Sequence, residues 1–166
     1  MDSKNICNKV TFSGYLPGSL ATLCAIQSAH YAKELGFDHL YESVVATGVG
    51  EFLGRYQPSK DFVRIVSEDH VVKGGIVIDS RDGTLAQLRW FILDGTLRGS
   101  GIGKTLISEA MEFVREREFP RVFLTTVSGL DAARRLYEYV GFNLVEEKSA
   151  STWGREVVEQ RFEWAL

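Results

Sequence analysis

Residues with β-branched and aromatic side chains fill the middle of the chain and predict three consecutive strands. These strands are expected over residues 61–69, 71–80 and 84–94, and the turn-like segments between them favour an antiparallel meander. The pair Gly74-Gly75 interrupts the second strand, which indicates a bulge or a close approach of two backbones.

Apolar residues recur at helical spacing on both sides of this meander. Two helices are expected before it, over residues 20–35 and 41–56, with Ser19 as the cap of the first and Gly36 at its end. After the meander, residues 102–118 carry one continuous apolar face and predict a strongly amphipathic helix.

Shorter segments complete the plan of the chain. A short helix is expected over residues 131–139, with Asp131 as its cap. The remaining strands are expected over residues 10–15, 121–127, 142–149 and 157–165. This order predicts an α/β protein with a mixed (α+β) sheet in a single domain over residues 1–166, with one βαβ crossover through residues 84–127.

Composition narrows the class of protein without identifying an activity. The 166 residues are 45% hydrophobic and 25% charged, values typical of a soluble globular domain. The net charge of −3 argues against a general affinity for nucleic acid, which needs a basic surface. Because no stretch reaches the roughly 18 apolar residues of a membrane span and the N-terminus does not resemble a signal peptide, we expect a cytoplasmic protein with no membrane partner.

Cysteine and histidine give no sign of a metal site. Cys7 and Cys24 form no CxxC pair, and the histidines at positions 30, 39 and 70 lack the spacing of metal ligands. We therefore expect two reduced thiols and no bound metal.

The segment RGSGIGKT, residues 98–105, lies between the last strand of the meander and the amphipathic helix. Three glycines alternate within it, at positions 99, 101 and 103. Backbone without a Cβ can approach a phosphate closely, and the helix N-terminus adds free N–H groups and a positive dipole end. Arg98 stands where a Walker A loop needs its first glycine, and Lys104 where a dinucleotide fingerprint needs its third. An ordinary tight turn is the alternative, and a nucleotide hydrolase is a third hypothesis that Arg98 disfavours.

This loop resembles the pyrophosphate pattern (Q/R)-x-x-G-x-(G/A) of the GNAT-superfamily N-acyltransferases. The segment AARRLYEYVGF, residues 132–142, resembles a second run of that family, A-x-x-L-Y-x-x-x-G-F. The order of elements is also similar to the GNAT fold along nearly the whole chain. In detail, the sequence is most similar to acetyltransferase domains fused to MarR-type regulators, through GYLPGSL, AQLRWFIL, GLDAARRLYE and WGREVVEQRFE.

The resemblance implies a mostly antiparallel central sheet with a βαβ unit that binds acetyl-CoA. It also implies direct transfer of the acetyl group to a primary amine of a small molecule or peptide, without a metal. The residues that it assigns to cofactor binding are Phe91, Ile92, Leu93, Arg98, Gly99, Ser100, Gly101, Ile102, Gly103, Lys104, Thr105 and Thr126. Backbone N–H groups between Phe91 and Leu93 would hold the pantetheine and polarise the thioester carbonyl.

Tyr137 matches the family tyrosine that donates a proton to the departing thiolate, although packing of an aromatic ring is the simpler alternative. Gln87 stands where several family members carry a glutamate base, and an amide accepts no proton at neutral pH. The identity of the general base therefore stays open. Four other residues could act as the base through water, or could serve only as structural or solvated polar residues. They are Asp79, Glu68, Glu51 and His30. Leu130 replaces a family asparagine that contacts the cofactor.

The acceptor cannot be identified from the sequence. Trp90, Tyr41 and Tyr56 are candidates for the wall of an acceptor pocket, although packing explains each of them alone. Gln87 and the resemblance to regulator-linked domains also favour a second function, an acyl-CoA sensor with little turnover. Strand edges near the C-terminus suggest that two copies pair as a homodimer.

Overall fold

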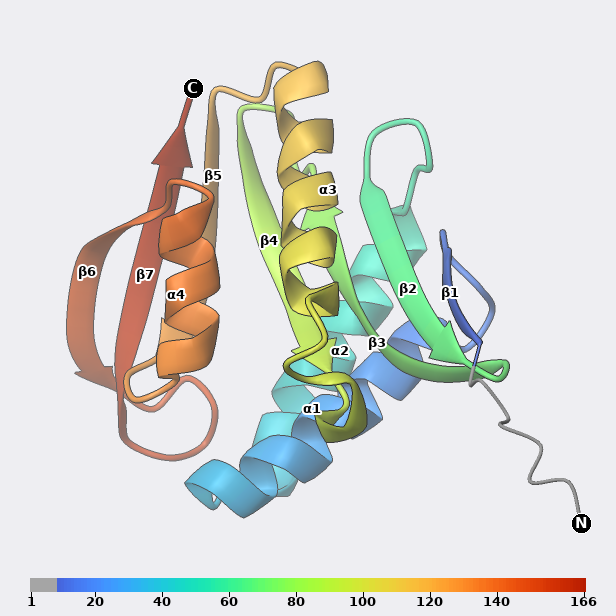
Figure 1. Cartoon of the computed structure of the whole chain (residues 1–166). Coiled ribbons are helices and arrows are strands. Elements are labelled where there is room, and N and C mark those ends of the chain that lie inside the picture. The colour runs from blue at the N-terminus through green and yellow to red at the C-terminus, as the bar shows by residue number, and fades with distance from the viewer. Residues whose placement is uncertain (1–8) are drawn as a thin grey trace, which may run out of the picture.

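A computed structural model describes residues 9–166 and places a seven-stranded sheet between two pairs of helices (Figure 1). The strands are β1 (Val10–Ser13), β2 (Phe62–Glu68), β3 (Val71–Asp79), β4 (Leu85–Leu93), β5 (Arg121–Val127), β6 (Asn143–Ala150) and β7 (Val157–Ala165). The helices are α1 (Ser19–Leu35), α2 (His39–Arg55), α3 (Ile102–Glu116) and α4 (Asp131–Tyr139). The mixed, mostly antiparallel sheet expected from the sequence is confirmed.

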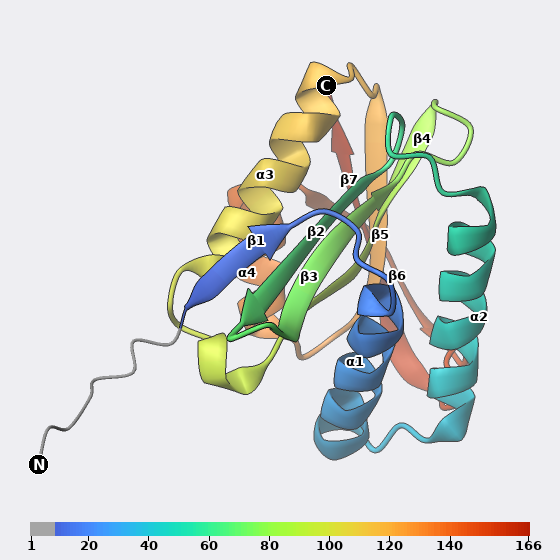
Figure 2. The same cartoon turned by 90° about the vertical axis from the view of Figure 1, so that its right-hand side faces the viewer.

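The strand order is β1-β2-β3-β4-β5-β7-β6, and every neighbouring pair is antiparallel except β4 and β5. The expected meander is β2-β3-β4, and the expected crossover runs from β4 through α3 to the parallel β5. Figure 2 shows α1 and α2 on one face of the sheet and α3 and α4 on the other. Each face has its own hydrophobic core, because each helix pair covers a separate set of buried side chains.

Several expected boundaries and caps differ in the structure. Ser19 does not cap α1: Gly18 holds the N-cap position with φ 81°, and the Ser19 hydroxyl accepts a hydrogen bond from the Leu16 N–H. Leu130, not Asp131, holds the N-cap of α4, and Asp131 is the first residue of the helix, where a negative charge in the first turn is favourable. Gly36 ends α1 as expected, in the left-handed conformation that glycine adopts at low cost.

Strand β4 contains a bulge that reverses which of its side chains face each core. Gly75 pairs with Ile92 and Val77 with Arg89, so two steps along β3 match three along β4. The extra residue is accommodated at Trp90, which adopts φ 47°. The close approach expected at Gly74 is confirmed, because a Cβ there would lie 2.5 Å from the carbonyl oxygen of Ile92.

Strands β4 and β5 are paired only where both begin. Their ladder joins Leu85–Gln87 to Arg121–Phe123, and the two strands then separate (Figure 1). Beyond Gln87, β4 therefore has no ladder to β5, and its backbone groups on that side face the space between the two strands. The split and the bulge lie next to each other in β4.

Candidate active site

A cavity lies at the split between β4 and β5 and reaches under α1 and α2. Its walls come from both faces of the sheet: Tyr41 belongs to the core under α1 and α2, whereas Tyr137 belongs to the core under α3 and α4. Phe91 and Thr126 face it from the two separated strands. The structure thus brings together three of the residues that the sequence assigns to the site, Phe91, Thr126 and Tyr137.

Tyr137 is almost wholly buried, and its ring packs 5.9 Å from that of Phe162 and 6.3 Å from that of Phe91, measured between centroids. Burial raises the pKa of the Tyr137 phenol above its ordinary value, and the nearby hydroxyl of Tyr31 adds to this shift. Burial, assisted by Tyr31, likewise raises the pKa of Tyr41. These phenols therefore stay protonated at neutral pH, so each can donate a proton or a hydrogen bond.

Aromatic rings form the end of the cavity beneath the α1–α2 turn. Phe37 stacks on Tyr41 at 4.9 Å and meets Trp153, from the loop between β6 and β7, at 6.5 Å. Arg155 of the same loop donates to the carbonyl oxygen of Leu35 at 2.8 Å. Sequence reasoning missed this loop, because the residues that hold it in place lie far away along the chain.

The glycine loop begins just after β4 and leads into α3. Gly101 occupies the N-cap of α3 with φ 86°, a conformation that residues with a Cβ rarely adopt. The first intrahelical bond runs from the Thr105 N–H to the Gly101 carbonyl at 3.1 Å, so the N–H groups of the first turn have no helical partner. The Arg98 Nε donates to the Leu93 carbonyl at 3.0 Å, which ties the loop to the end of β4.

Other side chains of the loop lie on its surface. The Lys104 ammonium rests over the ring of Tyr139 at 4.2 Å, and the hydroxyl of Ser100 donates to the carbonyl of Leu97. Gly101, Lys104 and Thr105 border a shallow hollow along α3 that is separate from the cavity at the split. The loop can hold phosphates with backbone N–H groups and cationic side chains, whereas the cavity can hold the reacting end of a ligand.

None of the four acidic or imidazole groups considered as bases lines the cavity. Glu51 is exposed on α2, and Glu68 lies at the far end of β2, where it pairs with Val10. Burial, followed by the positive charge of Arg98, lowers the pKa of His30. Asp79 is buried within a polar network at the end of β3.

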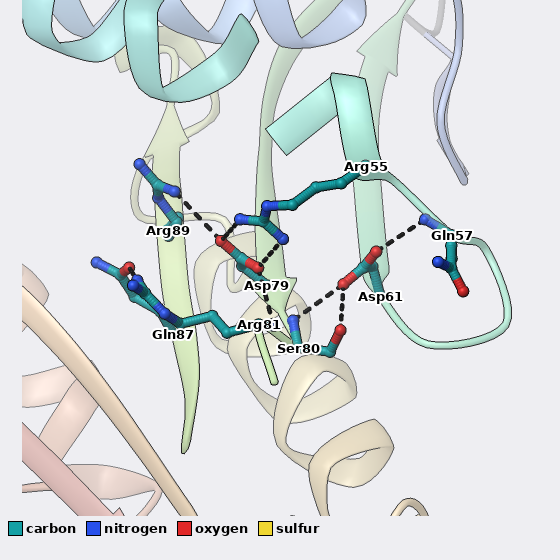
Figure 3. A network of polar contacts seen from close by, with 8 residues as sticks. All are labelled: Arg55, Gln57, Asp61, Asp79, Ser80, Arg81, Gln87 and Arg89. Carbon is teal, nitrogen blue, oxygen red and sulfur yellow. Dashed lines mark hydrogen bonds and ion pairs between the residues drawn. The ribbon is translucent and has the colours of Figure 1, made fainter. Parts of the chain in front are cut away.

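Figure 3 shows this network around Asp79. Arg55 donates to both carboxylate oxygens of Asp79, at 2.7 and 2.6 Å, and Arg89 donates to one of them at 3.2 Å. Burial alone would raise the pKa of Asp79, but the hydrogen bonds and charge of Arg55, together with the Arg81 N–H and Arg89, hold it below the usual range. Asp79 is therefore an ion-pair partner in this structure and not a free base.

Gln87 does line the cavity, and its Oε1 accepts a hydrogen bond from the Arg81 guanidinium at 2.7 Å. Trp90 and Tyr41 line it as well, as expected for an acceptor pocket. Tyr56 does not, because its ring packs against Tyr15 near the opposite end of α2. Leu130 stands at the rim, where it offers no polar group.

Some sequence expectations concern features away from the cavity. Cys24 is buried on α1 as a free thiol, and Cys7 lies outside the described residues. Among residues 9–166, no cluster of three or more histidine, cysteine, aspartate or glutamate side chains has the arrangement of a metal site. Over the same residues, none of the helices combines the length and apolar character needed to cross a membrane.

The split strands and the glycine loop at a helix N-terminus are features of an acetyltransferase. Residues 27–142 match the model of the Acetyltransferase (GNAT) family, and the chain belongs to this family. Similar solved structures include an acetyltransferase from Streptococcus agalactiae 2603, with TM-score 0.72 and 22% identity over 95% of this chain and 98% of that one. Another is yncA from Salmonella typhimurium, solved with its cofactor acetyl-CoA, with TM-score 0.70 and 18% identity over 95% of this chain and 94% of that one.

Two relatives are more similar in sequence over shorter regions. N-acetylaspartate synthetase of Xenopus tropicalis is 31% identical over 120 residues, which is 70% of this chain and 43% of the relative. The N-acetyltransferase YjgM of Escherichia coli strain K12 is 32% identical over 92 residues, or 54% of this chain and 55% of the relative. The chain thus matches about half the length of these relatives. The family and these names point to an N-acetyltransferase, and the resemblance to GNAT acyltransferases expected from the sequence is confirmed.

Proposed function

We propose that this chain transfers an acetyl group from acetyl-CoA to a primary amine by direct attack in a ternary complex. The observation that carries the proposal is the separation of β4 from β5 beside the glycine loop, since it gives one ligand a phosphate site and a path into the cavity. Gly99, Gly101 and Gly103 leave backbone N–H groups accessible to a pyrophosphate, with Arg98 and Lys104 as nearby cations.

The residues of the cavity have distinct parts in this proposal. Acetyl-CoA supplies the thioester. The backbone of β4 from Phe91 to Leu93 orients the ligand along the split and directs an N–H at the thioester oxygen, with Thr126 on the opposite strand. As the amine nitrogen bonds to the carbonyl carbon, the C–S bond breaks, and the Tyr137 hydroxyl gives its proton to the thiolate.

The amine must reach the cavity in its neutral form; the surplus proton of the product amide nitrogen leaves to water, and the Tyr137 phenolate regains a proton from water. Gln87 takes no part as a base, because its amide is neutral and bonded to Arg81. This same observation favours the second candidate, an acyl-CoA sensor with little turnover. Release of CoA thiol with any amine above the rate of background hydrolysis would count against the sensor.

The first test is titration calorimetry with acetyl-CoA. Gly101→Glu places a carboxylate where the pyrophosphate is expected, and Gly101→Gln has the same shape and the same backbone strain without the charge. Both variants should remain folded, and the glutamate variant should bind at least about tenfold more weakly than the glutamine variant, because like charges repel. A folded wild type that binds no acetyl-CoA would refute the proposal.

Three finer expectations remain predictions. A homodimer would pair the edge strand β6, whose side chains are exposed along almost its whole length. The cytoplasmic location and the link to a MarR-type regulator rest on the sequence alone. Sedimentation of the purified chain over a range of concentrations would test the dimer.

A further inference from the structure

The polar network around Asp79, beside the cavity, carries more positive than negative charge. Arg55 takes both oxygens of this carboxylate, which leaves Arg89 a single bond of 3.2 Å to an oxygen that already has a partner. Among residues 9 to 166, the Arg81 guanidinium forms no ion pair and donates a hydrogen bond only to the neutral amide of Gln87, while the Arg81 backbone N–H donates to Asp79. Asp61, the other carboxylate of the network, accepts hydrogen bonds from Ser80 and the Gln57 N–H instead.

Of these positive groups, Arg89 lines the cavity, and Arg81 contacts the cavity wall through its hydrogen bond to Gln87. In Figure 3 the guanidinium groups of Arg81 and Arg89 lie on the same side of Asp79 as Gln87, whereas Asp61 lies on the opposite side. Arg89 and Gln87 both line the cavity. Arg81 donates to Oε1 of Gln87, and the two N–H donors on Gln87 Nε2 have no hydrogen-bond partner within the described part of the chain and are left to bind a ligand. The wall therefore presents donors and positive charge where a base would need an acceptor.

Arg89 is held in place rather than mobile. Its guanidinium lies 4.2 Å from the ring centre of Trp90, and its Nη2 occupies the space beside Gly48, where a Cβ would come within 2.5 Å. Burial lowers the pKa of Arg89; the hydrogen bond and charge of Asp79 oppose this shift, and the charges of Arg81 and Arg55 add to it. An arginine in a protein stays charged nevertheless, so an anion bound beside it would offset the cost of burying that charge.

We propose that the acceptor is a primary amine that also carries a carboxylate, such as an amino acid, and that Arg89 binds this carboxylate together with Gln87. This inference rests on the proposed acetyl transfer. A planar guanidinium presents paired N–H donors that match the two oxygens of a carboxylate. Arg89 stands only two residues before Phe91, within about 7 Å along the strand, so one small molecule can span both.

The same charge assists the chemistry. A positive wall disfavours the ammonium form of a nearby amine and so lowers its pKa, which increases the neutral fraction without a dedicated base. The positive charge beside the acceptor would thus fill part of the role that a glutamate at position 87 plays in several members of the family.

The test compares matched amines that differ by one carboxylate: aspartate against asparagine, and glycine against glycinamide. Release of CoA thiol is followed with saturating acetyl-CoA, and the acetylated amine is confirmed by mass. Wild type should favour the carboxylate member of at least one pair by about tenfold or more in kcat/KM, since hydrogen bonds between charged groups are the strong ones. Arg89→Met should remove this preference mainly by raising KM, and Arg89→Lys should keep part of it.

The control is Arg64→Met, because Arg64 is a similarly half-buried arginine on β2 that pairs with Glu109 instead of facing the cavity. This variant should keep the wild-type preference. Binding of acetyl-CoA by each variant, measured by calorimetry, separates a damaged fold or cofactor site from a changed acceptor site. If wild type binds no acetyl-CoA, the proposed function itself fails.

Three results would overturn the inference while leaving acetyl transfer intact. They are equal or better turnover of the uncharged amines, an unchanged preference in Arg89→Met, and faster turnover of phosphoethanolamine than of every carboxylated amine. Acetyl-CoA binding with no turnover of any carboxylated amine would overturn it as well. If Arg89→Met does not fold, the substrate preferences of wild type and of the Arg89→Lys variant test the inference instead.

Discussion

Replacing Asp79 by asparagine should destabilise the protein strongly at neutral pH. The carboxylate is fully buried and neutralises Arg55 and Arg89 together. Removing one partner of a buried ion pair costs about 3–5 kcal/mol. Because the Arg55 side chain is 43% exposed and water can solvate it, we expect a smaller loss of stability here, of about 2–3 kcal/mol. For a chain of this size that loss corresponds to a fall in Tm of roughly 4–12 °C.

The same substitution should behave differently in acid. The pKa of Asp79 is depressed in the folded protein, so its stabilising effect is present above its unfolded pKa of about 3.9 and is lost as the pH falls through the lower folded value. The difference in stability between wild type and Asp79→Asn should therefore be largest near neutral pH and shrink below about pH 4.

Urea unfolding at several pH values measures this difference directly. Asp38→Asn is the control, since Asp38 is an exposed cap of α2 and asparagine caps a helix equally well. If the difference in stability between wild type and Asp79→Asn stays constant from neutral pH to pH 3, or if there is no difference, the carboxylate is not held by its arginines as described.

Tyr137→Phe should lower kcat for thiol release by about 100-fold or more, because it removes the proposed acid while keeping the packed ring. Tyr41→Phe, which removes a second buried hydroxyl of the same cavity, should lower kcat far less, and equal effects would argue against Tyr137 as the acid. Gly74→Ala should cost about 1–3 kcal/mol or more in urea unfolding, because its methyl group would lie 2.5 Å from the Ile92 carbonyl oxygen. Gly50→Ala should instead stabilise the protein by about 0.5–1 kcal/mol, since that position of α2 is open; a loss of stability there would contradict the described surroundings.

Local patterns were sufficient to predict most of the fold. The β-branched runs predicted β2, β3 and β4, and the apolar face of α3 predicted that helix to within two residues of its end. The helix caps were harder to predict, because Ser19 and Asp131 carry side chains that suit a cap but lie one position inside their helices. The conformation of the preceding residue decides such cases, and sequence alone does not give it.

The acceptor side of the cavity was predicted least well. Trp153 and Arg155 lie in a loop without a periodic pattern, and their positions depend on contacts with the α1–α2 turn. The partner of Arg155, Leu35, is 120 residues away in the sequence. The polar network was missed for a similar reason, because Asp79 and Arg55 come together only when α2 packs on the sheet.

The bulge at Trp90 has a consequence for how such an enzyme can change. Upstream of it, the side chains of Gln87 and Arg89 line the cavity, where we propose that the acceptor binds. Downstream, residues 91–93 would serve the proposed cofactor through backbone groups that almost any amino acid supplies. Strand β4 thus contains one segment that acts through its side chains and a second segment that acts through its backbone. If the proposed acceptor site is correct, point substitutions at 87 and 89 would redirect the enzyme to new acceptors while the binding of the acetyl donor stays unchanged.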